Sequence, residues 1–206
     1  MRIITISREF GSGGREIGKR LADVLGFDYY DSEIISAVAK NKGLDKEYVE
    51  LNLSNHGWQN VPISFRGTIG STAYIQSSKI QLLIEQKRVI ETIAALGKDV
   101  VIVGRNADVL LREYNPFNVF VCADTETKLK RCRERAKEGE VYTDKQLIRK
   151  MKYIDKTRAK TRALMTGTGW GERDEYHLTL NTAGWEIKSL VPIVAYFSDL
   201  WFRGKE

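Results

Sequence analysis

Residues 2–26 read RIITISREFGSGGREIGKRLADVLG, and this stretch decides the fold. Residues 2–7 are rich in β-branched side chains, which predicts a short buried strand. A glycine-rich turn follows, and a helix is expected from about Arg15 until Gly26 stops it. A turn between a strand and a helix places backbone N–H groups at a helix N-terminus, where they and the helix dipole attract anions. The residues predicted to cradle a phosphate group are Gly11, Ser12, Gly13 and Gly14.

Further along the chain, short apolar runs alternate with amphipathic segments. Strands are predicted at 27–30, 99–103, 118–123 and 176–181, and helices at 15–25, 32–39, 45–53, 79–96, 125–137, 143–165 and 185–202. Short strands that alternate with helices indicate an α/β fold with a parallel sheet. The intervening residues 54–78 are rich in Ser, Gly, Asn and Thr, so they are expected to form a long loop of the kind that often carries function.

The composition excludes several classes of protein. The chain has 206 residues, of which 42% are hydrophobic and 29% charged, as in a soluble globular protein of one domain. No stretch approaches 18 uncharged apolar residues, and the N-terminus lacks a signal-peptide cleavage site, so neither a membrane span nor secretion is expected. Cys122 and Cys132 cannot form a disulfide framework. We expect a cytoplasmic protein.

The positive charge is concentrated in residues 128–162. This segment holds fourteen Lys or Arg residues against five Asp or Glu, whereas the whole chain has a net charge of +6. Such a balance indicates phosphate binding, although a solvated helical face gives the same pattern. Only two aromatic residues, Tyr142 and Tyr153, lie in the segment, which disfavours a nucleic acid as the ligand.

The glycine turn partly matches the P-loop pattern G-x-x-x-x-G-K-[ST], in two possible registers. One register runs from Gly13 to Lys19 and matches the pattern up to the lysine. Lys19 would then lie more than one turn inside the helix and point to solvent. The other ends the loop at Gly13 and Gly14 and starts the helix at Arg15, so it loses both the lysine and the hydroxyl. We favour the second register, because it keeps the strand–loop–helix context. Arg15 would then contact a phosphate in place of the lysine, since a cation at a helix N-terminus is unfavourable without an anion.

Three other polar residues follow predicted strands. Arg105 comes directly after the strand at 99–103, and ligands bind at the carboxyl ends of strands in open parallel sheets. Asp108 either orients Arg105 or begins the next helix. Asp31 ends the second strand, where it is a candidate for binding the substrate. Capping of the following helix explains this residue equally well.

Taken together, these motifs resemble the cytidylate kinase-like proteins, a branch of the P-loop nucleoside monophosphate kinases. The resemblance is carried by ITISREFGSGGREIGKRLADVLGFDYYD, VIVGRNAD, IDKTRAKTRALMTGTGWG and YHLTLNT, so it covers nearly the whole chain. It implies the three-layer fold of P-loop NTPases in a single domain over 1–206. That domain would hold a five-stranded parallel sheet, a helical substrate-closing insert at about 32–78 and an arginine-bearing lid at about 139–173. The implied activity is phosphoryl transfer from ATP to a nucleoside monophosphate such as CMP, or to another small acceptor.

The resemblance also implies roles for the basic segment. Leu147, Met151 and Ile154 form an apolar stripe at helical spacing, and the stripe continues into Arg158 and Arg162. Both arginines are therefore expected to face the nucleotide phosphates. Asp155 matches the family pattern D-x-x-R with Arg158, and we expect it to position that arginine.

The chain departs from the family at the sites that matter for catalysis. The loop lacks the family sequence G-S-G-K-S/T. Where the family has G-R-D, this chain has Gly104-Arg105-Asn106. Of the family stretch D-T-G-x-x-Y-R only Asp31 remains, and it is followed by SEII. Mg²⁺ would bridge the ATP phosphates through water, with no metal-binding side chain from the protein. A nucleotide-binding protein with little catalysis, such as a pseudokinase or sensor, is the main alternative, and a basic nucleic-acid-binding module is the second. The sequence leaves the acceptor and the oligomeric state open.

Overall fold

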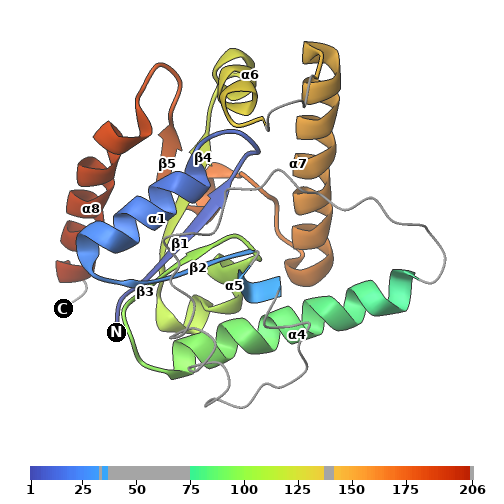
Figure 1. Ribbon diagram of the computed structural model, residues 1–206. Helices are drawn as coiled ribbons and strands as arrows, with labels where there is room; N and C mark the ends of the chain where they lie inside the picture. Colours follow the sequence, from blue (N-terminus) through green and yellow to red (C-terminus); the bar gives the residue numbers. More distant parts are fainter. Residues whose placement is uncertain (33, 37–74, 137–141, 205–206) are drawn as a thin grey trace.

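The sheet has the predicted class and strand number. A computed structural model describes residues 1–32, 34–36, 75–136 and 142–204. Within these residues, five strands form one sheet of order β2-β3-β1-β4-β5, and each pair of neighbouring strands is parallel (Figure 1). The strands are β1 (Ile3–Arg8), β2 (Asp28–Asp31), β3 (Val100–Val103), β4 (Phe117–Cys122) and β5 (Leu178–Asn181). Each begins and ends within two residues of its predicted bounds.

β1 occupies the centre of the sheet because its residues are buried on both faces. Ile4 pairs with Val101 of β3 on one side and with Phe117 of β4 on the other. Burial of both faces explains why β1 and β3 read as nearly continuous apolar runs. Since all strands are parallel, their carboxyl ends lie at one edge of the sheet, which we call the carboxyl edge. β1 ends there at Arg8 and β2 at Asp31.

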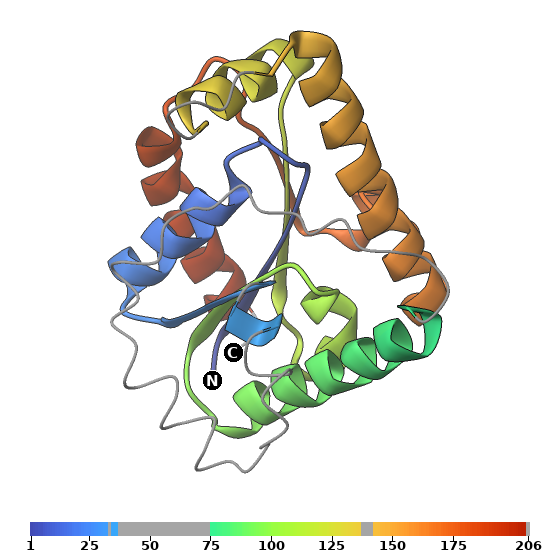
Figure 2. The same cartoon turned by 45° about the vertical axis from the view of Figure 1, so that its right-hand side comes forward.

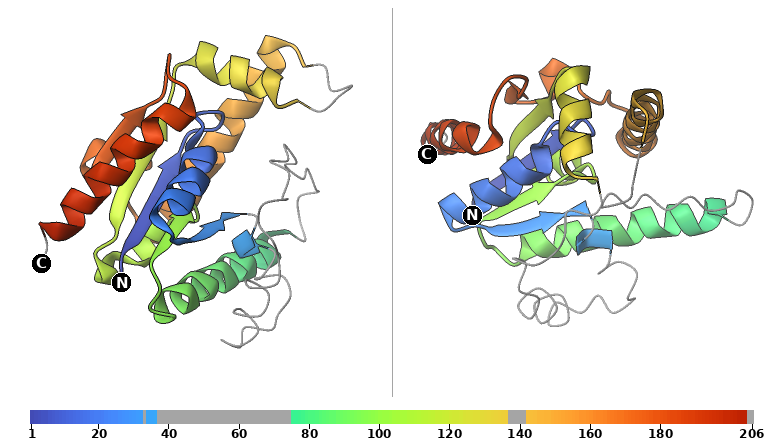
Figure 3. Two further views of the ribbon diagram at one scale, coloured as in Figure 1. Left: turned by 60° about the vertical axis from the view of Figure 1, so that its left-hand side comes forward. Right: turned by 45° about the horizontal axis from the view of Figure 1, so that its top comes forward.

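Helices cover both faces of the sheet, which gives three layers (Figures 1 and 3). The α-helices are α1 (Gly14–Leu25), α4 (Ile75–Ala95), α5 (Ala107–Leu110), α6 (Thr125–Glu134), α7 (Asp144–Thr166) and α8 (Ile187–Arg203). On one face, α1 and α8 bury Ile17, Leu21 and Val194 against the sheet. On the other face, α4 and α5 bury Ile90 and Leu111. These two cores bring the ends of β1, β2 and β3 together.

The basic helix α7 packs against α6 and runs down the side of the sheet (Figure 2). It begins with a capping box, in which Thr143 and Gln146 satisfy each other's backbone N–H groups. Leu147 and Met151 are buried with Leu129 and Cys132 of α6. The predicted inward stripe is therefore confirmed at its N-terminal half, and it fixes which face of α7 the later residues Asp155, Arg158 and Arg162 share.

Part of the predicted insert lies outside the described residues. The helix expected at 45–53 and most of the loop expected at 54–78 belong to this part, as does His56. α4 begins at Ile75, four residues before the predicted start, so the end of the expected loop is helical instead. A helix also starts at Ser32 and is described as far as Ser36. In the described part of the chain, no helix has the length and hydropathy needed to cross a bilayer.

Candidate active site

The glycine loop leaves β1 and enters α1 through a left-handed turn. Gly13 is the N-cap residue of α1 with φ +87°, and Gly11 has φ +80°. Both are conformations that side-chain-bearing residues rarely adopt. The helix starts at Gly14, one residue before the predicted start at Arg15. As in any helix, the first backbone N–H groups of α1 have no acceptor within the helix, and they lie at the carboxyl edge.

A buried arginine that sequence reasoning missed fixes the shape of this loop. Arg131 of α6 donates from Nη1 to the Ser12 carbonyl at 3.0 Å and to Thr182 Oγ1 at 2.7 Å. Its Nη2 donates to the carbonyls of Thr182 and Trp185, each at 3.0 Å. Arg131 thereby ties the loop to the connection between β5 and α8. It stands among many charged residues of the basic segment, and no spacing signal distinguishes it from its exposed neighbours.

The glycines of the loop are packed against protein rather than left open. A Cβ at Gly13 would lie 2.3 Å from Ile187 Cδ1, and one at Gly14 would lie 2.6 Å from Arg8 Cβ. Close approach of α8 and of the end of β1 is therefore one reason for glycine at these two positions. Their predicted part in a phosphate cradle stays a prediction.

We therefore expect Gly13→Ala to destabilise the fold itself. The left-handed conformation costs an alanine about 1–2 kcal/mol, and the overlap with Ile187 adds to it. Urea unfolding should show the loss without any nucleotide present. As a control, Gly26→Ala has the same left-handed φ but meets nothing within 4 Å, so it should cost less. Equal losses for the two variants would contradict the close contact with Ile187.

The structure brings Arg15 and Asp31 together. Arg15 Nε lies 2.5 Å from Asp31 Oδ2, and the Asp31 side chain is buried. Asp31 also accepts the Ile34 backbone N–H at 3.1 Å, so it caps the helix that follows β2 as well as pairing with Arg15. The capping interpretation of Asp31 is therefore confirmed, and its role in binding a substrate stays a prediction. Arg15 is half-buried at the carboxyl edge rather than turned to solvent.

Arg105 leaves β3 in a left-handed conformation with φ +60°, and its side chain turns back toward β2. Its Nη2 donates to Ser36 Oγ at 2.8 Å and to the Ser32 carbonyl at 3.3 Å. Its Nε is buried and has no hydrogen-bond partner among the described residues. Burial lowers the pKa of Arg105, and the charge of Arg158 lowers it further. Arg105 thus presents an unsatisfied donor beside a second cation.

Arg158 and Asp155 of α7 contact the loop as a pair. Asp155 Oδ1 accepts from Arg158 Nη1 at 3.0 Å and from the Phe10 backbone N–H at 2.9 Å. Arg158 Nη1 also donates to the Arg8 carbonyl at 2.8 Å. Burial raises the pKa of Asp155, and Arg158 only partly opposes that shift. Asp155 therefore orients Arg158, as expected, and the pair joins α7 to the start of the glycine loop.

Arg8, at the end of β1, is a second residue that sequence reasoning missed. Its Nη2 donates to Ser32 Oγ at 3.2 Å. Burial, followed by the charges of Arg158 and Arg105, lowers the pKa of Arg8 to about 9, so it still carries its charge at pH 7. An arginine that directly follows five buried strand residues is the signal that could have identified it.

These side chains form one basic site at the carboxyl edge, which we call the arginine group: Arg8, Arg15, Arg105 and Arg158. Among the described residues, the carboxylates that pair with it are Asp31 and Asp155. Within the described ranges, Asp31 pairs with Arg15 and Asp155 pairs with Arg158, while Arg8 and Arg105 lie close enough to Arg158 for their charges to interact. Like charges that are buried together are unfavourable unless an anion joins them. The arginine group is therefore suited to bind a ligand with several negative charges.

Arg162 does not join the arginine group, which corrects the expectation that it faces the same phosphates as Arg158. Its side chain is fully buried and forms an ion pair with Asp108. It also donates to Glu175 and to Thr168 Oγ1, each at 3.0 Å. Burial alone would lower the pKa of Arg162, but Asp108, Tyr176 and Glu175 together outweigh it and raise the pKa. Asp108 accordingly orients Arg162 and not Arg105.

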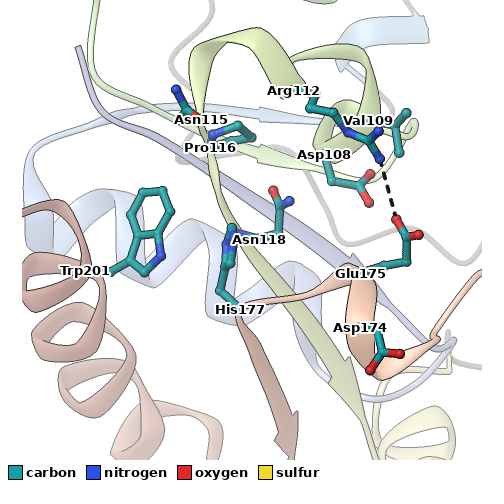
Figure 4. A pocket seen from close by; sticks show the side chains of 10 residues that line it. All are labelled: Asp108, Val109, Arg112, Asn115, Pro116, Asn118, Asp174, Glu175, His177 and Trp201. Atoms are coloured by element: carbon teal, nitrogen blue, oxygen red, sulfur yellow. Dashed lines mark hydrogen bonds and ion pairs between the residues drawn. The ribbon is translucent and has the colours of Figure 1, made fainter. Parts of the chain in front are cut away.

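Two pockets border these elements. One, of about 260 Å³, lies beside the Arg162 network: Figure 4 shows Asp108 and Glu175 on one side of it, with an ion pair from Arg112 to Glu175 at 3.9 Å. The other, of about 540 Å³, lies between α1, α6 and the start of α8, next to the glycine loop. Its lining includes Arg131, Trp185 and Ile187, so it shares residues with the support of the loop.

The histidine and cysteine side chains of the described ranges are held in packed or hydrogen-bonded positions. In the described ranges, no three His, Cys, Asp or Glu residues cluster to hold a metal ion. His177 Nδ1 accepts the Asn118 backbone N–H at 2.9 Å, and its ring stacks on Phe117, so it is a packing residue. Cys122 and Cys132 are free thiols, and burial raises the pKa of each.

Comparison with known proteins identifies relatives of the chain. The model of the cytidylate kinase-like family matches residues 3–184. An uncharacterised protein from Eubacterium ventriosum is 25% identical, with a TM-score of 0.71 over 97% of this chain and 99% of that one. Shikimate kinase from Bacteroides thetaiotaomicron is 15% identical, with a TM-score of 0.55 and coverage of 96% and 98%. A sugar kinase from a Janibacter species is 15% identical, with a TM-score of 0.52 and coverage of 97% and 95%. No curated protein matches.

Proposed function

The chain belongs to the cytidylate kinase-like family, and we propose that it transfers a phosphoryl group from ATP to a nucleoside monophosphate of the CMP type or another small acceptor. The observation that carries this proposal is the arginine group, because Arg8, Arg105 and Arg158 lie close enough for their charges to interact at the edge of the sheet where ligands bind. Phosphoryl transfer requires positioning and charge neutralisation rather than covalent help from the protein. Four fixed guanidinium groups supply both.

The donor nucleotide fits the α1 side of the site. The backbone N–H groups at the N-terminus of α1 would bind its phosphates, with Arg15 beside them. The pocket of about 540 Å³ continues from the loop toward Trp185, and it would hold the base and ribose of ATP. Trp185 is 57% exposed, so its ring is available for stacking on a base.

The acceptor fits the β2 and β3 side. Arg105 would bind the acceptor phosphate, with its buried Nε among the donors, and Asp31 would keep Arg15 in place. Arg158, oriented by Asp155, would contact the transferred group. An acceptor phosphate oxygen forms a bond to the γ-phosphorus while the bond to the bridging oxygen breaks, and the electron pair leaves with ADP. A phosphate acceptor needs no general base.

Mg²⁺ would enter with the nucleotide. Where the P-loop pattern places a metal-binding hydroxyl, this chain has Arg15, so its loop does not supply that ligand. Mg²⁺ commonly keeps several waters and binds through substrate phosphates. When bound, it neutralises charge on the donor oxygens.

The test is release of ADP from ATP and Mg²⁺ in the presence of a panel of nucleoside monophosphates and small hydroxyl acceptors. We expect acceptor-dependent ADP release, with CMP among the active acceptors. A phosphorylated product identified by mass spectrometry would distinguish transfer from simple ATP hydrolysis. ADP release at the same slow rate with every acceptor and with none would contradict the proposal.

A nucleotide-binding protein without transferase activity is the second candidate. The observation that favours it is Gly14, which stands where the P-loop pattern has its lysine. Such a protein would be stabilised by ATP in thermal denaturation, by an amount set by the ratio of ligand concentration to dissociation constant. It would release no ADP with any acceptor of the panel.

The two loop registers differ in which cation binds ATP. We expect Arg15→Ala to weaken ATP binding by roughly ten- to hundredfold, because one charge-assisted phosphate contact contributes about 1.5–3 kcal/mol. Lys19→Ala should weaken it by well under 1 kcal/mol, since Lys19 lies in the second turn of α1. Isothermal titration of both variants measures this. A larger loss for Lys19→Ala would show that the other register is right.

A further inference from the structure

Arg8 and Gly14 occupy related positions of the P-loop pattern. When its second glycine is placed at Gly13, as the start of α1 requires, the first glycine of the pattern falls on Arg8 and the lysine falls on Gly14. This chain therefore has a cation where the pattern has a glycine, and a glycine where the pattern has a cation.

The two positions share one volume. A Cβ at Gly14 would lie 2.6 Å from Arg8 Cβ and 3.0 Å from Arg8 Cγ. Contacts under 3.0 Å between such atoms require something to move. The stem of Arg8 thus fills the space into which a side chain at position 14 would project. A lysine at position 14 and an arginine at position 8 are mutually exclusive in this backbone.

The head of Arg8 extends from that shared volume into the arginine group. It reaches Ser32 Oγ at 3.2 Å, and a Cβ at Gly104 would overlap its Nη1, so the glycine after β3 is what admits the guanidinium. The charges of Arg158, Arg105 and Asp31 all act on it. Arg8 therefore lies between the loop and the residues assigned to the acceptor.

We propose that Arg8 supplies, from the first position of the loop, the positive charge that the P-loop lysine supplies in the typical pattern, and that it contacts the phosphoryl group in transfer. The role of Arg8 in transfer rests on the proposed function. Its role in binding an anion rests on the exchange of side chains between positions 8 and 14. The chain would then keep a loop cation despite having lost the lysine.

The first experiment tests the shared volume by a double-mutant cycle. Gly14→Lys alone should lower the melting temperature by about 4–8 °C, because it overlaps Arg8. In the Arg8→Gly background, the same Gly14→Lys change should cost much less, since the tightest overlaps are then gone and only the contact with Val121 Cβ at 3.2 Å remains. An equal loss of melting temperature in both backgrounds would overturn the exchange.

The second experiment tests the charge with inorganic tripolyphosphate, whose binding needs no catalysis. Arg8→Met keeps the apolar stem, removes the charge and should raise the dissociation constant by roughly ten- to hundredfold. The Arg8→Gly/Gly14→Lys double variant should recover at least a tenth of wild-type affinity. Arg88→Ala, which removes an exposed charge on α4, is the matched control and should change nothing. Unchanged binding to Arg8→Met, with the melting temperature retained, would overturn the role of Arg8.

Turnover then separates the two proposals. If the wild-type chain transfers phosphate and Arg8→Met loses about a thousandfold in kcat, both stand. If the wild-type chain transfers phosphate and Arg8→Met does so equally well, the inference about Arg8 fails and the proposed function remains. If the wild-type chain transfers nothing while tripolyphosphate binding still depends on Arg8, the proposed function fails and Arg8 is an anion-binding residue.

Discussion

Arg158→Ala should lower kcat by about 10³ while the KM for ATP changes by less than about fivefold. An arginine that stabilises charge on a transferring phosphoryl group contributes about 10³–10⁵ to kcat in well-studied phosphotransferases. We expect the lower end, because Arg8 and Arg105 lie close enough to act on the same charge. An interaction made mainly in the transition state lowers kcat when it is removed, whereas a uniform binding contact raises KM.

The geometry of α7 explains why Arg158 is the residue to test. Asp155 holds its guanidinium at 3.0 Å, and the Phe10 backbone N–H in turn holds Asp155, so the arginine is oriented before any ligand binds. Asp155→Asn should therefore reproduce part of the kcat loss without removing the positive charge. That intermediate effect is what a positioning residue produces.

Steady-state kinetics with the best acceptor of the panel measures both parameters. Lys156→Ala is the matched control, because it removes an exposed charge from the same helix two residues away. Arg158→Lys should rescue only weakly, since an ammonium cannot reproduce the planar fork of a guanidinium. Equal small losses for Arg158→Ala and Lys156→Ala would show that α7 is only a basic surface.

The alternation of short apolar runs with amphipathic segments was sufficient to predict the fold. Strands such as 99–103 are buried on both faces, and a buried parallel strand must be apolar throughout, so its pattern does not depend on distant residues. The strand at 176–181 begins two residues later than predicted. The His177 backbone N–H still donates to the Asn118 carbonyl, but the Asn118 backbone N–H donates to the His177 ring nitrogen Nδ1 and not to a main-chain carbonyl. Element bounds depend on such tertiary contacts.

The candidate site was predictable only in part. Arg15, Asp31 and Arg105 stand directly after strands or at a helix start, so the topology alone brings them to one edge of the sheet. Arg8 and Arg131 were missed because their roles depend on close approach of other segments, at Gly14 and Ser12 respectively. The sequence around the loop gives no signal of these tertiary contacts.

For Arg162, helical periodicity predicts the direction of the side chain correctly but not the residues that it contacts. The stripe from Leu147 correctly predicts that Arg162 points inward. It cannot show that the end of α7 lies over Asp108 and Glu175, since those residues come from the α5 segment and from the connection before β5. An arginine that points inward from a helix such as α7 can therefore either bind the ligand or hold the helix in place.

Arg162→Met should reduce the free energy of unfolding by about 3–5 kcal/mol, because it leaves the buried Asp108 carboxylate without its cation. For a chain of this length, such a loss lowers the melting temperature by roughly 6–20 °C. Glu175 is the less affected partner, since it is 24% exposed and lies 3.9 Å from Arg112. Urea unfolding of the protein without ligand measures the change.

The double variant Arg162→Met/Asp108→Leu should recover most of that stability, because replacing both members of a buried ion pair with apolar side chains is often neutral. Arg112→Ala removes only an exposed partner of Glu175, so its cost should stay under about 1 kcal/mol. If Arg162→Met instead keeps the wild-type stability and loses turnover as Arg158→Ala does, then Arg162 leaves Asp108 when the nucleotide binds. The original prediction that both arginines of the stripe face the phosphates would then be correct for the bound state.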